Sequence, residues 1–254
     1  MCSRAMVSAA YSAAIRAARA IVRETDFISQ KLHVNMITQR LETFYGEPQW
    51  PGRADPLDNL VLTILSQSTN DNNRDTAFRR LSTRFPTWLE VMNAPIDHIA
   101  DAIRPAGLGN QKAARIKEIL TWISQTYGAL DLDFICDLDP EQVKTTFMQL
   151  KGIGIKTISV VLMISCGVDI FPVDTHVHRI CRRLGLAPDN ASAEKTHELM
   201  QPLVPTGKSY SLHMNLLKLG RNVCKAQNPR CESCPLADVC QYATGKEPSI
   251  SGRH

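Results

Sequence analysis

Two charged residues lie beside an unusually apolar stretch, "LKGIGIKTISVVLMISCGVDIFPVDTHVHRI", which runs from residue 150 to residue 180. Lys156 follows Gly152 and Gly154, and Asp174 stands 18 positions after the lysine. A lysine at the start of a helix with apolar neighbours has a lowered pKa, because the positive helix end and poor solvation both disfavour the ammonium. The free amine can then attack an electrophilic carbon and form a Schiff base. The alternative is a surface lysine whose stem only covers apolar groups.

The aspartate can serve either chemistry or helix capping. Apolar Phe171, Pro172 and Val173 precede Asp174, and the sequence after it predicts a new helix. A carboxylate at that point often only caps the helix. In a site, it could stabilise a developing cationic sugar or transfer a proton.

The two glycines predict a tight turn between helices. Gly152 and Gly154 are expected to adopt conformations that a Cβ would forbid. The turn would present free N–H groups at the start of the next helix, where anions bind. A duplex phosphate suits such a turn because the contact carries no sequence information. An ordinary corner between two helices would have the same glycines.

Four of the eight cysteines are clustered near the C-terminus in "CKAQNPRCESCPLADVC". Cys224, Cys231, Cys234 and Cys240 have the spacing C-x6-C-x2-C-x5-C. Four thiolates this close in sequence can bind one tetrahedral metal ion or one iron–sulfur cluster. Zinc sites usually contain two CxxC pairs, whereas this loop has only one, so the spacing favours an iron–sulfur cluster. Zinc remains the alternative.

The other four cysteines are Cys2, Cys136, Cys166 and Cys181. They are scattered, and they are expected to be small hydrophobic residues with free thiols. A secreted disulfide protein would spread paired cysteines along a short chain. The pattern therefore favours a reducing compartment.

Helical periodicity recurs along the chain, and the segments are separated by Pro, Gly, Asn or Asp. In "LDNLVLTILSQST", for example, the apolar residues fall on one helical face. No segment alternates long enough to predict a sheet. We therefore expect an all-α fold of ten or more short helices.

The overall composition is that of a soluble globular protein. The chain is 44% hydrophobic and 21% charged, with a net charge of +4. It has no uncharged apolar run of about 18 residues, so we expect no membrane span. The first 23 residues contain four arginines and no acid. This resembles a mitochondrial transit peptide, although a solvated amphipathic helix has the same pattern.

Several motifs in order give the chain a family likeness. "ILSQST", "AGLGNQKA", "LKGIGIKT", "VDTH", "LHMNLLKLGRNVC" and the four-cysteine loop resemble the helix-hairpin-helix DNA glycosylases, and most closely the endonuclease III family. The likeness covers residues 49–245.

This resemblance implies two helical domains with a DNA groove between them. Residues 49–168 would form a six-helix barrel that contains the helix-hairpin-helix motif. Residues 1–48 and 169–254 would form the other domain, with a [4Fe–4S] cluster in the loop at 224–240. The partner would be damaged double-stranded DNA. The protein would not associate with a membrane and would be a monomer. We expect it in the cytoplasm near the nucleoid, or in mitochondria or the nucleus of a eukaryote.

The resemblance also implies an activity in base excision repair. Lys156 would attack the sugar C1′, Asp174 would assist departure of the base, and the resulting imine would permit β-elimination. The expected enzyme is a bifunctional DNA glycosylase and AP lyase that removes oxidised pyrimidines. One alternative is a uracil or thymine mismatch glycosylase with weak lyase activity. Another is a non-catalytic DNA-binding or redox-sensing module.

Five further residues match positions that contact DNA in the family. Leu108 matches the wedge position, and His176 and Arg179 match the DNA-facing side of a helix. The glutamine that fills the space of the flipped base aligns with Ser68, and Gln67 lies one place earlier. The chain departs from the family pattern at three positions near these sites. Lys151 replaces a proline, Ile155 a basic residue and Gly109 a bulkier residue.

Overall fold

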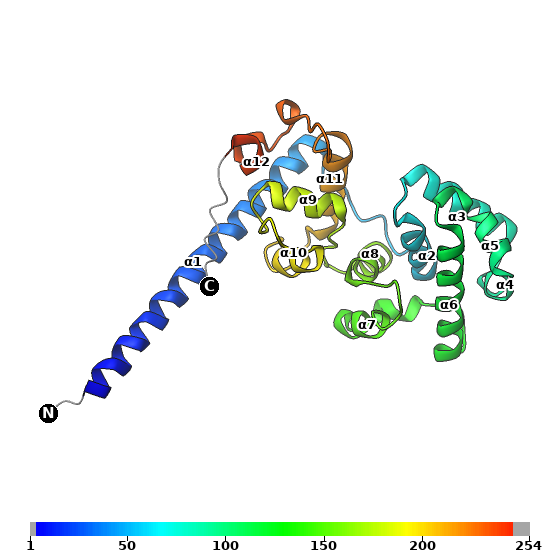
Figure 1. Cartoon of the computed structure of the whole chain (residues 1–254), viewed down its shortest axis with the longest axis horizontal. Helices are drawn as coiled ribbons and strands as arrows, with labels where there is room; N and C mark the ends of the chain where they lie inside the picture. Colours follow the sequence, from blue (N-terminus) through cyan, green and yellow to red (C-terminus); the bar gives the residue numbers. More distant parts are fainter. Residues whose placement is uncertain (1–3, 246–254) are drawn as a thin grey trace. The chain divides into compact units, whose positions relative to one another are not determined.

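The structure is a computed structural model that describes the backbone of residues 4–245 and the side chains of residues 24–245. All regular elements in this part of the chain are helices, so the prediction of an all-α fold is confirmed. Two compact units are present (Figure 1). The hairpin unit is Gln49–Asp174, and the cluster unit is Met1–Pro48 with Thr175–His254. The boundary falls after Asp174, whereas the sequence placed it after residue 168.

The hairpin unit contains seven α-helices and two 3-10 helices within Gln49–Asp174. Polar residues start four of them: the side chains of Asp55, Asn70, Thr87 and Asp139 each accept a hydrogen bond from an N–H of the first turn. The elements are α2 (Pro56–Ser66), α3 (Asp71–Arg84), α4 (Trp88–Asn93), α5 (Ile96–Ala102), η1 (Arg104–Ala106), α6 (Gly109–Tyr127), η2 (Asp133–Asp137), α7 (Pro140–Phe147) and α8 (Ile155–Cys166).

Helix α8 is the central helix of the hairpin unit. Seven of its twelve residues are buried, on more than one face. It packs against α2, whose apolar face includes Leu60 and Ile64. A polar contact sets the register of the pair, because Asn59 Nδ2 donates to Ser165 Oγ at 2.8 Å. A helix buried on several sides is held rigidly, so the lysine near its start has a fixed position.

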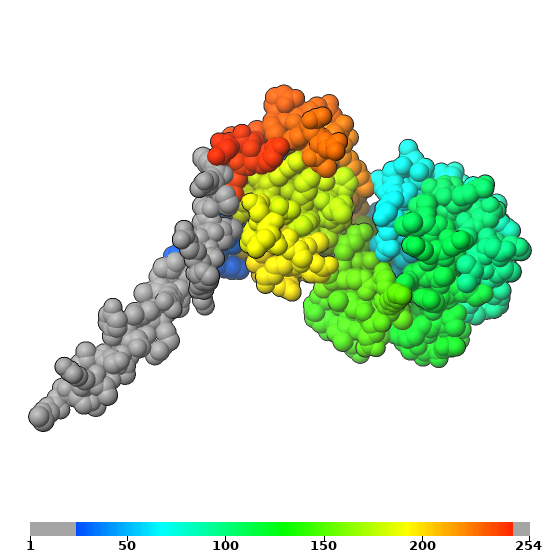
Figure 2. All heavy atoms as spheres, in the orientation of Figure 1, coloured from blue at the N-terminus to red at the C-terminus, as the bar shows by residue number. Residues whose placement is uncertain are grey.

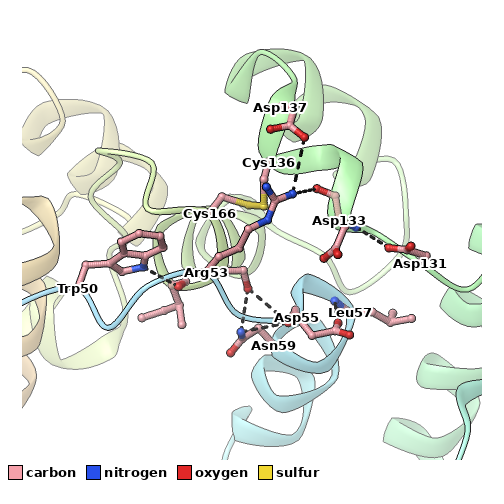
Figure 3. Close-up of a disulfide and its surroundings, with 12 residues drawn as sticks. Trp50, Arg53, Asp55, Leu57, Asn59, Asp131, Asp133, Cys136, Asp137 and Cys166 are labelled. Atoms are coloured by element: carbon pink, nitrogen blue, oxygen red, sulfur yellow. Dashed lines mark hydrogen bonds and ion pairs between the residues drawn. A yellow bond between two sulfur atoms is a disulfide. The ribbon is translucent and has the colours of Figure 1, made fainter.

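Cys136 and Cys166 form a disulfide between η2 and the end of α8 (Figure 3). The prediction that both are free thiols buried as hydrophobic residues is therefore wrong: each is bonded and partly exposed. Cys181 is a fully buried free thiol, as expected, and Cys2 lies outside the described residues. Pairing depends on the tertiary approach of two segments, which the spacing of the cysteines along the chain does not reveal.

The segment before α2 packs on the same end of α8. Trp50 Nε1 donates to the carbonyl of Ile164 at 2.8 Å, and the ring of Trp50 lies against Gly167. Arg53 donates to the carbonyl of Asp133 at 2.6 Å, so the segment also contacts η2 (Figure 3). The last turn of α8 is thus held by a covalent bond and by this segment.

The cluster unit is built around one long helix and the helices that follow Asp174. Its elements are α1 (Arg4–Tyr45), α9 (Thr175–Arg183), α10 (Ala193–Met200), α11 (Ser209–Asn222), η3 (Cys231–Ser233), η4 (Ala237–Val239) and α12 (Gln241–Thr244). With 42 residues, α1 is far longer than the short helices expected from the sequence. The transit-peptide prediction rests on side chains of the first 23 residues, which lie outside the described part. No helix in the described part is long and apolar enough to cross a membrane.

Polar bonds connect the second half of α1 to the rest of the cluster unit. Glu42 accepts from Lys208 Nζ at 3.1 Å and from Ser211 Oγ at 2.7 Å. Arg40 pairs with Asp238 at 2.6 Å, next to the cysteine loop. Buried Val34, Ile37 and Leu41 supply the apolar contact. The end of α1 therefore supports both α11 and the loop.

Candidate functional site

Lys156 is the second residue of α8 and is only partly exposed. Burial is the main cause that lowers the pKa of its amine, and the positive charge of Arg74 lowers this pKa further. The carboxylate of Asp174 acts in the opposite direction and raises it. The prediction of a lowered pKa is confirmed in direction, and its main cause is desolvation. A larger fraction of the amine is therefore free at neutral pH than for a surface lysine.

Asp174 is the last residue of the hairpin unit and is partly exposed. Its predecessors Phe171 and Val173 are buried, and they anchor the chain at this point. Because its charge acts on Lys156, the two groups share one electrostatic environment within the unit. The structure therefore brings together the two residues that the sequence singled out.

Arg74 is a residue of this site that sequence reasoning missed. It lies in the first half of α3 and pairs with Asp71 at 3.0 Å and with Asp75 at 2.7 Å. The segment "NRDTAFRR" carries several arginines, and nothing in it distinguishes Arg74 from the others. No spacing in the sequence connects residue 74 with residue 156.

The turn before α8 uses its two glycines differently. Gly152 has φ +84°, and a Cβ there would lie 2.9 Å from Arg115 Nε, so any other residue would be strained. Gly154 has an ordinary φ of −96° with open space where a Cβ would be. The prediction that both glycines need a forbidden conformation is therefore wrong for Gly154. Arg115 donates to the carbonyl of Lys151 and holds the turn from the side of α6.

The start of α8 has free hydrogen-bond donors. No side chain caps this end, and the N–H groups of Gly154, Ile155 and Lys156 have no acceptor among the described residues. Such groups at a helix start bind anions. The missing Cβ of Gly154 leaves the approach to them open.

Gln67, Ser68 and Leu108 all lie on the hairpin unit, in two exposed loops. Gln67 Nε2 is 3.4 Å from the carbonyl of Gly152, so this side chain reaches the turn before α8. Ser68 and Leu108 have φ of +54° and +51°, and Leu108 is 54% exposed. At Gly109, where the chain departs from the family pattern, a Cβ would lie 3.1 Å from the carbonyl oxygen of Ala100.

His176 and Arg179 lie on α9 in the cluster unit. The guanidinium of Arg179 donates to the carbonyls of Gly220 at 3.0 Å and Cys224 at 2.8 Å, and it contacts His176 Nδ1 at 3.1 Å. Helices α9 and α11 meet closely here, since a Cβ at Gly220 would lie 2.8 Å from His176 Cβ. Arg179 therefore fixes the start of the cysteine loop, and its contact with DNA stays a prediction.

The four clustered cysteines are free thiols in a loop at the surface of the cluster unit, orange to red in Figure 2. Burial raises the pKa of Cys234 and Cys240, and the charges of the neighbouring cysteines raise it further. The thiols are therefore near one another. Among residues 24–245, no three metal-binding side chains close around one ion position. In a four-iron cluster each thiolate binds a different iron, so the sulfurs need not meet at one point.

Arg183, at the end of α9, is the second residue that sequence reasoning missed. Its guanidinium donates to Cys224 Sγ at 3.2 Å and lies over the ring of Tyr242, 4.5 Å from its centroid. Its carbonyl accepts from Cys240 Sγ at 3.2 Å. One arginine thus contacts the first and last cysteines of the loop and offsets thiolate charge. The donor set and this cation fit an anionic iron–sulfur cluster.

Comparison with known proteins agrees with this class of site, a helical hairpin with a four-cysteine loop. The family model described as the HhH-GPD superfamily base excision DNA repair protein matches residues 61–206. The model of the iron–sulfur binding domain of endonuclease III matches residues 224–240. Endonuclease III of Thermotoga maritima is 34% identical over 188 residues, which cover 74% of this chain and 84% of that protein.

Two other relatives extend the comparison. An Arabidopsis thaliana protein named as a DNA glycosylase is 38% identical over 189 residues, and the match spans 64% of its length. The structure of a non-covalent endonuclease III–DNA complex superposes with a TM-score of 0.73 at 25% identity, covering 85% of this chain and 97% of that one. The chain belongs to the HhH-GPD superfamily of base excision DNA repair proteins. It binds DNA, and Cys224, Cys231, Cys234 and Cys240 are the thiolates available to a [4Fe–4S] cluster.

Proposed function

We propose that this DNA glycosylase is bifunctional: it excises oxidised pyrimidines from damaged duplex DNA and then cleaves the strand as an AP lyase. The observation that carries the proposal is the partly buried Lys156, whose pKa is lowered, with the carboxylate of Asp174 acting on it. A glycosylase that uses only water as its nucleophile has no need of an amine here. We further propose that it acts as a monomer.

The chemistry follows from these two groups. The free amine of Lys156 attacks C1′ of the sugar, and the bond from C1′ to the base breaks, so the base leaves with the bonding electrons and takes up a proton. The negative charge of Asp174 stabilises positive charge on the sugar while this bond breaks. As the sugar ring opens, one proton passes from the lysine nitrogen to the ring oxygen, and the nitrogen and C1′ form a protonated imine. Removal of a C2′ proton then expels the 3′ phosphate, which nicks the strand.

The same unit offers groups for the DNA backbone. The free N–H groups of Gly154, Ile155 and Lys156 suit a phosphate oxygen, and the gap at Gly154 leaves room for it. This contact would bring the strand close to the amine of Lys156, because the amine and the N–H groups belong to the same turn. Lys151 is exposed beside the turn and adds positive charge.

A trapping experiment tests the proposal. Duplexes that contain one oxidised pyrimidine are incubated with the protein and borohydride, which reduces an imine to a stable amine. We expect a covalent protein–DNA product with the wild type and none with Lys156→Ala. Lys195→Ala is the control, because it removes an exposed lysine of α10 that has no part in the proposed chemistry or DNA contact. If the wild type excises the base but cannot be trapped, the lyase assignment is wrong.

The lesion range is tested with a panel of duplexes. We expect faster excision of oxidised pyrimidines than of uracil or of thymine mispaired with guanine. The reverse order would support a mismatch glycosylase with weak lyase activity. Binding without excision of any of these bases would indicate a non-catalytic module.

A further inference from the structure

Lys112 is a buried lysine of α6 that the proposed chemistry does not use. Only 4% of its surface is exposed, yet its Nζ donates to two backbone carbonyls, Leu65 O and Ala106 O, each at 2.8 Å. A lysine is seldom buried unless its charge is compensated. Burial also lowers the pKa of this amine. The side chain therefore has a specific task at this point of the hairpin unit.

Both acceptors lie at helix ends. Leu65 is the residue before the last in α2, and Ala106 is the last residue of η1. The final carbonyls of a helix have no partner within it, and a positive charge is favourable beside them. One ammonium therefore caps two helices at once and joins them across the unit.

Each capped helix leads into a loop with an unusual backbone. Ser68 follows α2, and Leu108 follows η1; both have positive φ, which non-glycine residues rarely adopt. Asn228 is the only other such residue in the described part of the chain. Conformations of this kind persist when the surrounding structure holds them, and they concentrate at functional sites. The exposed side chain of Leu108 sits on one of these two residues.

The other hydrogen bonds of these loops are local or long: Gly107 N–H donates to Arg104 O at 3.1 Å, Lys112 N–H to Leu108 O at 3.0 Å, and Gln67 Nε2 to Gly152 O at 3.4 Å. Leu108 precedes α6 without a side-chain cap, and close packing of Gly109 on Ala100 fixes only the helix start. After α2, the backbone bonds are Gln67 N–H to Ile64 O at 3.2 Å and Thr69 N–H to Ser66 O at 3.3 Å. The two bonds of Lys112 are shorter than these, and among the hydrogen bonds of residues 24–245 they are the ones that join the end of α2 to the end of η1.

We propose that Lys112 is a positioning residue that holds Ser68 and Leu108 ready to enter the duplex when a base is flipped out. The inference rests on the proposed function, because it assumes that the enzyme extrudes the damaged base. Flipping costs unstacking, and side chains that fill the gap offset this cost only if they are ordered beforehand. Lys112 orders both loops through one nitrogen, so they act together.

Lys117 provides a matched control on the same helix. Its Nζ also donates to a backbone carbonyl, that of Ala94, at 2.7 Å. Ala94 follows α4, and no residue with positive φ follows it there. Lys117→Met therefore removes the same kind of bond without disturbing Ser68 or Leu108. Lys112→Met and Lys117→Met are each measured at the same number of degrees below their own unfolding midpoint.

The readout is the fluorescence of 2-aminopurine placed opposite an abasic site in a duplex at saturating protein. Entry of Leu108 or Ser68 unstacks this base and raises its fluorescence. We expect the rise for Lys112→Met to be less than about half that of the wild type, since the inserted state loses population. Lys117→Met should behave as the wild type. An undiminished rise with Lys112→Met overturns the proposal.

Two further outcomes remain distinct. If Lys112→Met does not fold, Lys112→Gln, which keeps one short polar group, must show a reduced rise, and an unchanged rise overturns the proposal. If the wild type gives no rise, these loops do not enter the duplex and the proposal fails. A wild type that gives the rise but no borohydride-trapped product leaves the role of Lys112 intact and overturns the lyase assignment alone.

Discussion

Asp174 raises the pKa of Lys156, in opposition to the burial that lowers it. The two residues thus tune the amine between two requirements. Desolvation frees the amine for attack, while the carboxylate limits how far the pKa falls and supplies charge for the cationic sugar. Arg74 lowers the pKa of Lys156, as burial does, so one positive and one negative charge act on this amine.

Substitutions of these two charged residues should shift the pH dependence in opposite directions. Asp174→Asn removes a group that raises the pKa of Lys156, so the pKa falls and free amine persists to lower pH. Arg74→Gln removes a group that lowers it, so the pKa rises. We expect the acidic limb of borohydride trapping to move down in pH for Asp174→Asn and up for Arg74→Gln. A preformed abasic site is the substrate, so departure of a base does not limit the rate; shifts of the same sign would contradict the assignment.

The glycines of the turn should separate stability from binding. Gly152→Ala forces a Cβ into a left-handed conformation and against Arg115, and it should destabilise the protein by about 1–2 kcal/mol. Gly154→Ala has neither problem, and it should leave the unfolding midpoint unchanged while weakening DNA binding. Thermal unfolding and DNA titration measure the two effects. Full DNA affinity in Gly154→Ala would mean that no phosphate approaches this turn.

The disulfide should contribute to thermal stability. It closes a loop between cysteines 30 residues apart, which the chain-entropy account values at about 3.5 kcal/mol. Reduction should therefore lower the unfolding midpoint by about 10 °C. The Cys136→Ser/Cys166→Ser variant should unfold at this lower temperature and should not respond to reductant. Absorbance near 400 nm shows whether the cluster is retained, and a midpoint that reduction leaves unchanged would show the two thiols to be unpaired in solution.

Loss of Arg183 should weaken retention of the iron–sulfur cluster. Arg183→Ala removes the contact with Cys224 Sγ and the cation above Tyr242, so uncompensated thiolate charge should open the loop. We expect faster loss of absorbance near 400 nm in the presence of a chelator. Arg182→Ala is the control, because Arg182 is exposed and only weakly paired with Asp189 at 3.9 Å. Equal rates for the two variants would exclude a specific role of Arg183.

The sequence was sufficient for features that depend on local order. Helical periodicity predicted an all-α fold, and the spacing of Cys224, Cys231, Cys234 and Cys240 predicted a cluster loop. The apolar neighbours of Lys156 predicted its poor solvation. In each case the residues that cause the property are close to one another along the chain.

The features that could not be predicted depend on tertiary approach. Arg74 acts on Lys156, which follows it by 82 positions in the sequence, and Cys136 meets Cys166 from a different element. The two bonds of Lys112 likewise join segments that no motif connects. The requirement for glycine at Gly152 but not at Gly154 follows from the position of Arg115, which lies on another helix.

The bond between Cys136 and Cys166 has a topological consequence. Together with the backbone between them it makes a closed covalent ring, and this ring contains α7, the glycine turn and Lys156. After a protease cut anywhere inside the ring, the two pieces of the chain stay joined through the disulfide. Two fragments would separate on a denaturing gel only after reductant is added, so the gel itself reports whether the ring is closed.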